Sequence, residues 1–312
     1  MNDLCQVLIG DCRETLKDVP DKSVQMCVTS PPYFGLRDYG ESGQIGLENT
    51  LEGYIENLKL VTDEVYRVLK DDGVLWLNLG DSYSSGNRPR ASIREDTYRA
   101  PTKQSIGAGA ARPPQLAGIK PKDLIGVPWQ VALAMRDSGW YLRTDIIWSK
   151  PNAMPESVTD RPTKSHEYIF LLTKSEHYLY DHEAIKEKAD MNRWGGDKPI
   201  NMNNTKDTDN QFAGLTRPRP MQSETRNKRS VWTINTTPYK DAHFATFPEE
   251  LPRLCILAGS KPGDTILDPF AGSGTTGKVA LELGRKALLC ELNPEYGELI
   301  KKRTTTTVGM PI

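Results

Sequence analysis

The chain has 312 residues, 26% of them charged, and a formal net charge of −1 at pH 7. This length allows one large α/β domain with a smaller module. The balanced charge excludes binding to nucleic acid through the overall charge of the protein, so a DNA-binding surface would need a local concentration of positive residues. No apolar run approaches the ~18 residues that span a bilayer. The first residues show no signal-peptide pattern, and the five cysteines include no Cys-x-x-Cys pair. Reduced thiols and a cytoplasmic location are therefore expected, with no membrane partner.

Apolar residues along the chain predict strands alternating with helices. Seven short apolar runs predict strands, at residues 4–9, 24–29, 74–79, 141–148, 167–173, 265–268 and 286–292. Four further segments predict helices, at residues 51–69, 124–137, 249–258 and 275–283. This alternation predicts an α/β fold whose mostly parallel seven-stranded sheet is covered by helices on both faces.

Two polar stretches interrupt the alternation. Residues 84–122 hold eight Lys or Arg against two acids, and residues 183–230 hold ten against seven, with the positive excess at 215–230. Long polar insertions in a compact α/β chain are functional loops or disordered segments. Both interpretations stay open for residues 84–122.

A glycine-rich turn follows the predicted strand 265–268, in the segment Asp268-Pro-Phe-Ala-Gly-Ser-Gly-Thr275. Gly272 and Gly274 allow the backbone to turn sharply and to approach a ligand closely. The next strand leads into the acid Glu291, at the position where Rossmann folds place a carboxylate that accepts hydrogen bonds from ribose hydroxyls. The order strand, loop, helix, strand and acid predicts a cofactor site.

The same turn also fits part of the phosphate-binding motif of NTPases, G-x-x-x-x-G-K, from Gly272 to Lys278. That motif continues with Ser or Thr to hold Mg²⁺, whereas this chain has Val279. An NTPase and a metal site are therefore not expected, and Lys278 is interpreted as a surface residue of the helix.

The segment Asp268–Thr275, together with Ser30-Pro31-Pro32-Tyr33, resembles the cofactor and catalytic motifs of amino-group DNA methyltransferases. The catalytic motif comes first, more than 200 residues before the cofactor motif, and this order resembles the β group of the family. The resemblance runs from Ile9 to Tyr296. It implies a Rossmann-like methyltransferase fold, S-adenosylmethionine as cofactor and double-stranded DNA as partner. It also implies a homodimer, as in many β-group enzymes, and a cognate restriction endonuclease encoded separately.

The resemblance also implies individual cofactor contacts. Asp11 matches the acid that holds the adenine amino group, and Asp268 with Gly272–Thr275 matches the methionine-end site. Residues 243–248 resemble the segment that closes over the cofactor, although they fit an ordinary helix entry equally well. The expected cofactor-binding residues are Asp11, Ser30, His243, Phe244, Phe247, Asp268, Phe270, Ala271, Gly272, Ser273, Gly274, Thr275, Glu291 and Leu292.

Ser30, Pro31, Pro32 and Tyr33 have the chemistry that methylation of an exocyclic amino group needs. The nitrogen lone pair of such a group is delocalised into the base, so acceptors for both N–H bonds are required, together with an in-line methyl group. The Ser30 hydroxyl and the Pro31 carbonyl can be these acceptors, Pro32 helps to fix the loop, and Tyr33 offers a stacking face. The target base has to leave the duplex to reach them.

Several reactions are compatible with this loop to different degrees. Within the family that the chain resembles, serine at the first position favours the 4-amino group of cytosine, whereas adenine enzymes more often carry Asp or Asn there. The 6-amino group of adenine is the alternative. Methylation of a protein glutamine amide is disfavoured by the motif order and the basic insertions. A non-enzymatic DNA-binding protein is disfavoured by the intact loop. No cysteine follows a proline, which disfavours methylation at carbon 5 of cytosine.

The positive excess indicates where DNA is bound. Lys and Arg neutralise phosphates, whereas base choice needs side chains that reach base edges. The resemblance implies a catalytic half at 1–182, a target-recognition region at 183–235 and a cofactor-binding half at 236–312. The expected DNA-binding residues are Trp148, Lys150, Arg217, Arg219, Arg226, Lys228 and Arg229.

His166, Glu167 and Asp81 are left with open roles. His166 and Glu167 either line the pocket for the flipped base or form a buried pair in the strand. Asp81 follows the strand 74–79, where ligands of parallel sheets bind.

Overall fold

A computed structural model describes residues 4–84, 116–189, 224–236 and 247–308. The chain divides into two units, one formed by Met1–Asp181 with Ser230–Ile312 and the other by His182–Arg229. The first unit contains the two halves of the expected methyltransferase fold. His166 and the glycine turn therefore belong to one folded unit, although about 100 residues separate them in the sequence.

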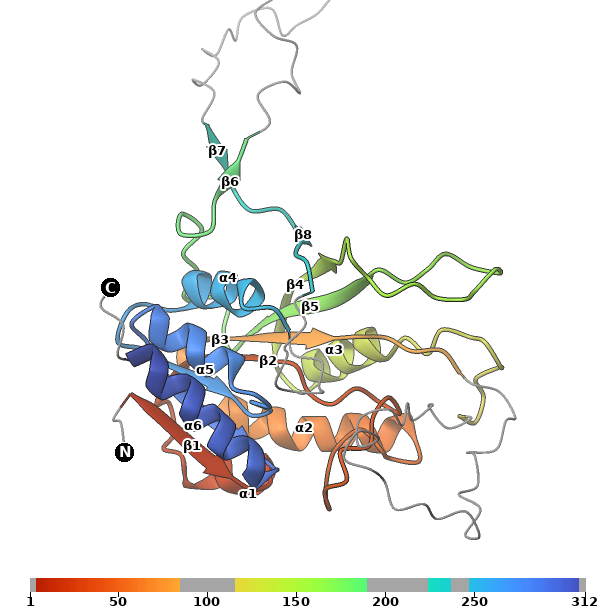
Figure 1. Ribbon diagram of the computed structural model, residues 1–312, viewed down its shortest axis with the longest axis horizontal. Helices are drawn as coiled ribbons and strands as arrows, with labels where there is room; N and C mark the ends of the chain where they lie inside the picture. Colours follow the sequence, from red (N-terminus) through yellow and green to blue (C-terminus); the bar gives the residue numbers. More distant parts are fainter. Residues whose placement is uncertain (1–3, 85–115, 190–223, 237–246, 309–312) are drawn as a thin grey trace, which may run out of the picture. The chain divides into compact units, whose positions relative to one another are not determined.

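An eight-stranded sheet forms the centre of the first unit (Figure 1), in the order β1-β10-β9-β2-β3-β5-β4-β8. Its strands are β1 (Cys5–Ile9), β2 (Val24–Thr29), β3 (Leu69–Leu79), β4 (Tyr141–Ser149), β5 (His166–Thr173), β8 (Val231–Thr233), β9 (Thr265–Asp268) and β10 (Lys286–Glu291). Only β5 runs antiparallel to its neighbours β3 and β4. The seven predicted strands are all present, and the mostly parallel sheet is confirmed.

The eighth strand corrects the predicted strand number. β8 pairs in parallel with β4 at the edge of the sheet, and Trp232 within it is buried. Its three residues lie beside a polar segment, and such a short run carries too little periodicity to distinguish a strand from a loop.

Helices cover both faces of the sheet in the first unit (Figure 1). One face carries α1 (Cys12–Thr15), the short η1 (Leu16–Asp18), α2 (Leu51–Val68) and α3 (Val127–Asp137), and the other carries α4 (Glu250–Gly259), α5 (Thr275–Glu282) and α6 (Pro294–Val308). The four predicted helices match α2, α3, α4 and α5. The long helix α6 was not predicted from the sequence, because its second half is a run of threonines, which are weak helix formers.

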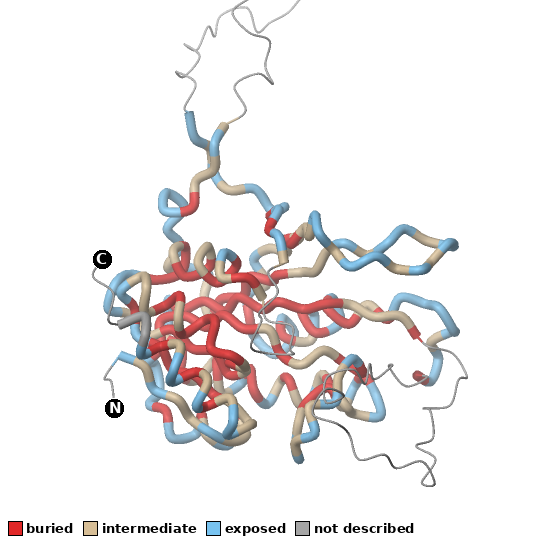
Figure 2. The backbone as a smooth tube through the Cα atoms, viewed as in Figure 1, coloured by how far each residue is buried: buried red, intermediate tan, exposed pale blue. Residues whose placement is uncertain are grey.

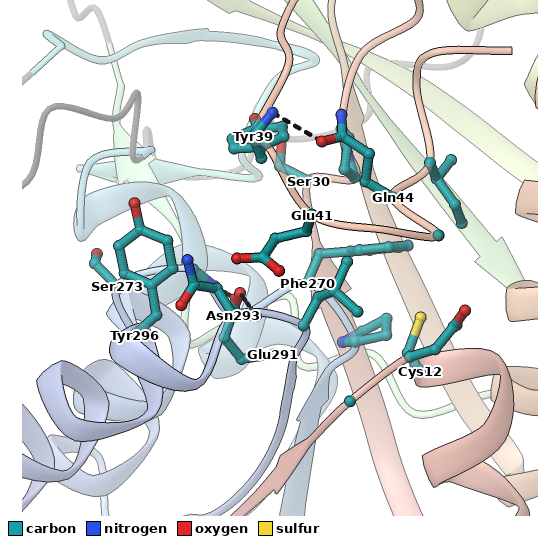
Figure 3. A pocket seen from close by; sticks show the side chains of 18 residues that line it. Cys12, Ser30, Tyr39, Glu41, Gln44, Phe270, Ser273, Glu291, Asn293 and Tyr296 are labelled. Carbon is teal, nitrogen blue, oxygen red and sulfur yellow. Dashed lines mark hydrogen bonds between the residues drawn. The ribbon is translucent and has the colours of Figure 1, made fainter. Parts of the chain in front are cut away.

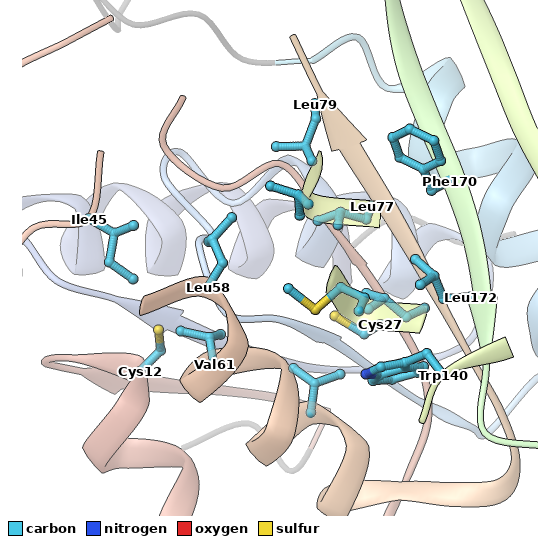
Figure 4. Packing of buried hydrophobic residues seen from close by; sticks show 14 of the residues in the cluster. Cys12, Cys27, Ile45, Leu58, Val61, Leu77, Leu79, Trp140, Phe170 and Leu172 are labelled. Carbon is cyan, nitrogen blue, oxygen red and sulfur yellow. The ribbon is translucent and has the colours of Figure 1, made fainter. Parts of the chain in front are cut away.

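The core follows from the alternation of side chains along β3. Leu75, Leu77 and Leu79 pack in one cluster with Leu58 and Val61 of α2 (Figure 4). Central strands are buried on both faces (Figure 2), as all six residues of β2 are. This continuous burial is why the strands appear in the sequence as unbroken apolar runs.

The second face shows the same packing. Val74 and Trp76 face Gly259 at the end of α4, where a Cβ atom would lie 2.7 Å from the Val74 side chain. Cys27, Cys255 and Cys290 are buried free thiols, in agreement with the reduced thiols expected from the sequence. No helix among the described residues is long and apolar enough to cross a membrane.

The parallel strands bring several loops to one edge of the sheet. β1, β2, β3, β9 and β10 all end there, and the antiparallel β5 begins there at His166. Ligands of open α/β sheets bind beyond the carboxyl ends of the strands. The catalytic loop after β2 and the glycine turn after β9 are therefore neighbours.

The second unit is described at its two ends, residues 182–189 and 224–229. There β6 (Glu187–Lys188) pairs antiparallel with β7 (Thr225–Arg226). The remaining residues of this unit, including Arg217 and Arg219, lie outside the described residues.

Candidate active site

A pocket opens at the carboxyl ends of β1, β9 and β10 (Figure 3). Its walls come from the ends of these strands, from the loop that follows β2 and from the start of α6. It is lined by Gly10, Asp11, Cys12, Ser30, Pro32, Tyr39, Glu41, Gly43, Gln44, Ile45, Pro269, Phe270, Gly272, Ser273, Glu291, Leu292, Asn293 and Tyr296.

Glu291 connects two sides of this pocket. One carboxylate oxygen accepts from the backbone N–H of Gly272 at 2.8 Å and the other from that of Asn293 at 2.9 Å. Burial raises the pKa of Glu291 above its ordinary value, against the opposing effect of these backbone hydrogen bonds. Each oxygen keeps a lone pair that can accept a hydroxyl from a ligand.

Asp268 lies under the glycine turn rather than in the pocket wall. Its carboxylate accepts from the hydroxyls of Thr29 and Thr276, both at 2.6 Å, and from the backbone N–H of Phe270 at 3.0 Å. Burial raises the pKa of Asp268. With its oxygens engaged in this way, Asp268 holds the turn against β2 and shapes the pocket without lining it.

Asp11 lies at the opposite wall, where β1 ends. It accepts from the backbone N–H of Arg13 at 2.9 Å and pairs with the Arg13 guanidinium, which also donates to the Gly43 carbonyl at 2.9 Å. Burial would raise the pKa of Asp11, but the hydrogen bonds from Arg13 outweigh it and lower the pKa. Arg13 thereby ties the loop after β2 to the acid in the pocket.

The catalytic loop Ser30–Tyr33 leaves β2 at the rim of the pocket. The Tyr54 hydroxyl donates to the Pro32 carbonyl at 2.9 Å and so anchors the loop on α2. Among the described residues, no group donates a hydrogen bond to the Pro31 carbonyl. Ser30 contacts Tyr33, with 3.2 Å between the two hydroxyl oxygens.

The Tyr33 ring is held in place at both ends. A Cβ atom on Gly80 would lie 2.6 Å from the ring, so only glycine permits this approach at the end of β3. The hydroxyl donates to the carboxylate of Glu167 at 2.7 Å and lies 3.1 Å from the side-chain oxygen of Asn78. Burial, followed by the charge of Glu167, raises the pKa of Tyr33 well above its ordinary value, so Tyr33 acts as a neutral phenol.

A family model described as DNA methylase, for N6 and N4 methyltransferases, matches residues 24–302. The chain belongs to this family of amino-group DNA methyltransferases. Type II methyltransferase M.SmaI of Serratia marcescens is 49% identical over 300 residues, which cover 96% of this chain and 90% of that protein. M.Cfr9I of Citrobacter freundii is 48% identical over 295 residues, covering 94% of this chain and 85% of that protein.

A solved structure supports the fold. The PvuII DNA methyltransferase (cytosine-N4-specific) has a TM-score of 0.64 to this chain, covering 96% of it and 86% of that protein at 19% identity. The predicted methyltransferase fold, β-group motif order and family are thus confirmed. As a member of the family, the chain uses S-adenosylmethionine as its methyl donor.

The pocket of this methyltransferase fits such a cofactor. The Glu291 carboxylate suits ribose hydroxyls, and the Asp11 carboxylate on the opposite wall suits an amino group. Phe270 offers an apolar face for a ring. Of the expected cofactor residues, the pocket is lined by Asp11, Ser30, Phe270, Gly272, Ser273, Glu291 and Leu292. Phe247, Asp268, Ala271, Gly274 and Thr275 do not line it, and His243 and Phe244 lie outside the described residues.

Sequence reasoning missed one wall of the methyltransferase pocket. Tyr39, Glu41 and Gln44 come from the loop after the catalytic residues, and Gln44 accepts from the backbone N–H of Tyr39 at 2.8 Å (Figure 3). Tyr296 comes from α6. The loop has glycines at 40, 43 and 46 in the left-handed region, which marks tight turning but does not reveal what the loop covers.

Two residues expected to bind DNA, Trp148 and Lys150, make contacts within the protein at the end of β4. Trp148 is 3% exposed, and its indole N–H donates to the Ile234 carbonyl at 2.9 Å. Its predicted contact with DNA is therefore not supported, because the indole is buried beside β8. Lys150 pairs with Glu167, and its ammonium lies 4.1 Å from the centre of the Trp148 ring.

Two described arginines of the second unit pair with one acid. Arg226 and Arg229 donate to Glu187 at 2.8 and 2.6 Å. These hydrogen bonds and the ion pairs lower the pKa of Glu187, although burial acts against them. Lys228, which lies between these two arginines in the sequence, is half-buried.

Two of the open roles are also decided by geometry. Asp81 accepts from the backbone N–H groups of Gly126 and Val127, both at 3.0 Å, and so caps α3. His166 contacts the ring of Tyr168 at 5.3 Å, whereas Glu167 contacts Tyr33. Successive residues of a strand point to opposite faces, so His166 and Glu167 do not form a pair.

Proposed function

We propose that this DNA methyltransferase transfers a methyl group from S-adenosylmethionine to the 4-amino group of a cytosine flipped out of duplex DNA. The observation that carries the proposal is the position of Ser30. Its hydroxyl lies at the rim of the cofactor pocket, next to the unoccupied acceptor of Pro31 and the ring of Tyr33. Serine at this position is the feature that favours cytosine over adenine.

The pocket residues of this chain hold the cofactor from two sides. Glu291 accepts ribose hydroxyls, Asp11 accepts the adenine amino group, and Phe270 packs against the adenine ring. Gly272 and Ser273 of the glycine turn line the side of the pocket that receives the methionine end, although the Gly272 N–H itself donates to Glu291. When bound, S-adenosylmethionine supplies an electrophilic methyl group on a positively charged sulfur.

The loop residues prepare the amino group for attack. Ser30 Oγ and the Pro31 carbonyl accept its two N–H bonds and draw the nitrogen towards tetrahedral geometry. Tyr33 stacks on the base, and its fixed ring limits the base to one plane. Fixing the two reacting groups in line lowers the barrier through orientation, so no covalent nucleophile is needed.

Phosphate binding is proposed for Arg217, Arg219, Arg226, Lys228 and Arg229 of the second unit, and a contact with base or phosphate for Lys150 of the first unit. A target-recognition role for residues 183–235, a homodimer, a separately encoded restriction endonuclease and action in the cytoplasm of a prokaryotic cell extend the proposal. The type II names of M.SmaI and M.Cfr9I are what support the restriction partner.

The catalytic assignment is tested with labelled cofactor, duplex DNA and the variants Ser30→Ala and Tyr33→Ala. Both variants are expected to lose methylation of DNA by at least about 100-fold, the size of effect that a lost acceptor or donor at a reacting group produces. Their cofactor affinity should stay within threefold of wild type. Loss of cofactor binding, or label that enters protein instead of DNA, would contradict the proposal.

A further inference from the structure

A chain of hydrogen bonds leads from Ser30 into the protein, away from the cofactor pocket. Ser30 Oγ lies 3.2 Å from the Tyr33 hydroxyl, and this hydroxyl lies 2.7 Å from an oxygen of Glu167. The residues come from the ends of β2 and β3 and from the start of β5, with Asn78 as the contribution of β3. These ends meet because β5 runs antiparallel to β3.

The direction of this chain is fixed by groups that can only accept. A carboxylate has no proton to donate. The Asn78 side-chain nitrogen donates to the Tyr168 carbonyl at 3.1 Å, so its oxygen is the atom that faces the Tyr33 hydroxyl. Both partners on this side of Tyr33 are therefore acceptors, and the single phenol proton points towards them.

Ser30 is left with one role at its contact with Tyr33. Because the phenol proton is used on the far side, the Tyr33 oxygen accepts the hydroxyl proton of Ser30. A serine hydroxyl otherwise rotates and can donate or accept. Here its lone pairs are kept for the amino group of the incoming base.

We propose that Glu167 is a positioning residue that, through Tyr33, holds Ser30 as a hydrogen-bond acceptor for the amino group. The proposal rests on the proposed function in one respect, that Ser30 contacts this amino group. Glu167 itself touches no substrate in this role. Its effect on the reaction passes through the Tyr33 hydroxyl.

Lys150 makes the role of Glu167 specific for a carboxylate. Its ammonium pairs with the second oxygen of Glu167, and both side chains are 17% exposed. If an amide replaces this carboxylate, its oxygen turns towards Lys150, which can only donate. The amide nitrogen then faces the Tyr33 hydroxyl and the side-chain nitrogen of Asn78, which lies 3.2 Å from the same carboxylate oxygen, and both of these groups donate. Glu167→Gln therefore disturbs the chain without changing the size of the side chain.

A double-mutant cycle on Glu167→Gln and Tyr33→Phe tests this role. The measurement is the single-turnover rate of methyl transfer to DNA at saturating cofactor and DNA. Glu167→Gln is expected to lower the rate about 100-fold and to leave cofactor affinity within twofold of wild type. In the Tyr33→Phe background, which lacks the hydroxyl, the same substitution should lower the rate less than threefold.

Glu156→Gln is the matched control, because Glu156 is also ion-paired, with Arg161 at 2.6 Å, in the segment between β4 and β5. It should methylate DNA at close to the wild-type rate. Equal losses from Glu167→Gln in both backgrounds would overturn the proposal, since they would show that Glu167 acts without Tyr33. The cycle follows methyl transfer to whichever base accepts it, so an adenine product contradicts the cytosine assignment while the cycle still decides the role of Glu167.

Discussion

The backbone N–H of Gly272 donates a hydrogen bond of 2.8 Å to the carboxylate of Glu291, 19 residues further along the chain. This contact joins the glycine turn after β9 to the end of β10. It explains why the spacing of glycines and acid indicates a cofactor site, because the acid both shapes the turn and faces the ligand.

Replacing Glu291 by glutamine should weaken cofactor binding. In wild type both carboxylate oxygens accept from backbone N–H groups, those of Gly272 and Asn293. In the variant the amide nitrogen would face one of these N–H groups, so that two donors would meet. The substitution would also remove the negative charge that strengthens hydrogen bonds from ligand hydroxyls. A hydrogen bond to a charged group contributes about 1.5–3 kcal/mol, so the Kd for S-adenosylmethionine should rise about 10- to 100-fold in calorimetric titration. Glu298→Gln, on the exposed side of α6, is the control. An unchanged Kd for Glu291→Gln would rule out the assigned contact.

Much of this site could be predicted from sequence because its parts are local. The turn Asp268–Thr275 carries its glycines and its flanking strand within a few residues, and Ser30–Tyr33 directly follows an apolar run. The partners of Asp268 show where local reasoning fails. Thr29 lies 239 residues away in the sequence, so no spacing reveals that this acid is consumed by internal hydrogen bonds.

Long-range contacts explain the other differences as well. Trp148 stands beside Lys150 among the residues expected to bind DNA, yet its indole is buried and donates to the carbonyl of Ile234, 86 residues further along the chain. The pocket wall formed by Tyr39 and Tyr296 likewise brings together residues that are far apart in the sequence. Burial by a distant segment leaves no periodic signal in the sequence that it covers.

Gly80→Ala should impair catalysis while sparing the cofactor. A Cβ atom at this position would meet the Tyr33 ring at 2.6 Å, so the ring has to move. Displacement of a stacking group by about 1 Å can cost about 100-fold in rate, and the loss should appear in the single-turnover rate. Cofactor affinity, measured on the same preparation, should remain within twofold of wild type. A normal rate would show that the position of Tyr33 is not critical.

Trp148→Phe should lower stability without changing DNA affinity. The substitution removes the indole donor to the Ile234 carbonyl and leaves a small gap, which together cost about 1–3 kcal/mol of unfolding free energy. Urea denaturation measures this loss. Binding to DNA at several salt concentrations should give the same affinity and slope as wild type. A clear fall in DNA affinity at unchanged stability would instead support the DNA contact that was predicted from sequence.

The ion pair of Asp11 and Arg13 should stabilise the fold in a pH-dependent way. The pKa of Asp11 is lowered in the folded state, so its contribution is fully present above the unfolded value of about 3.9 and is lost as the pH falls through the lowered pKa. The partly exposed pair is worth up to about 1 kcal/mol. Urea denaturation should therefore show wild type to be more stable than Asp11→Asn at pH 7.

That difference should shrink progressively as the pH falls below about 5. Asp18→Asn, at an exposed position of η1, controls for the removal of one negative charge. A stability gap for Asp11→Asn that grows on acidification would contradict the sign of this shift.

The chemical identity of the methylated base is the most direct measurement. The wild-type enzyme is incubated with duplex DNA and S-adenosylmethionine that carries an isotopically labelled methyl group, and the DNA is then digested to nucleosides for mass spectrometry. Ser30 at the rim of the pocket predicts that the label is recovered as N4-methylcytosine. Recovery of the label as N6-methyladenine, or its absence from every nucleoside, would contradict the proposed reaction.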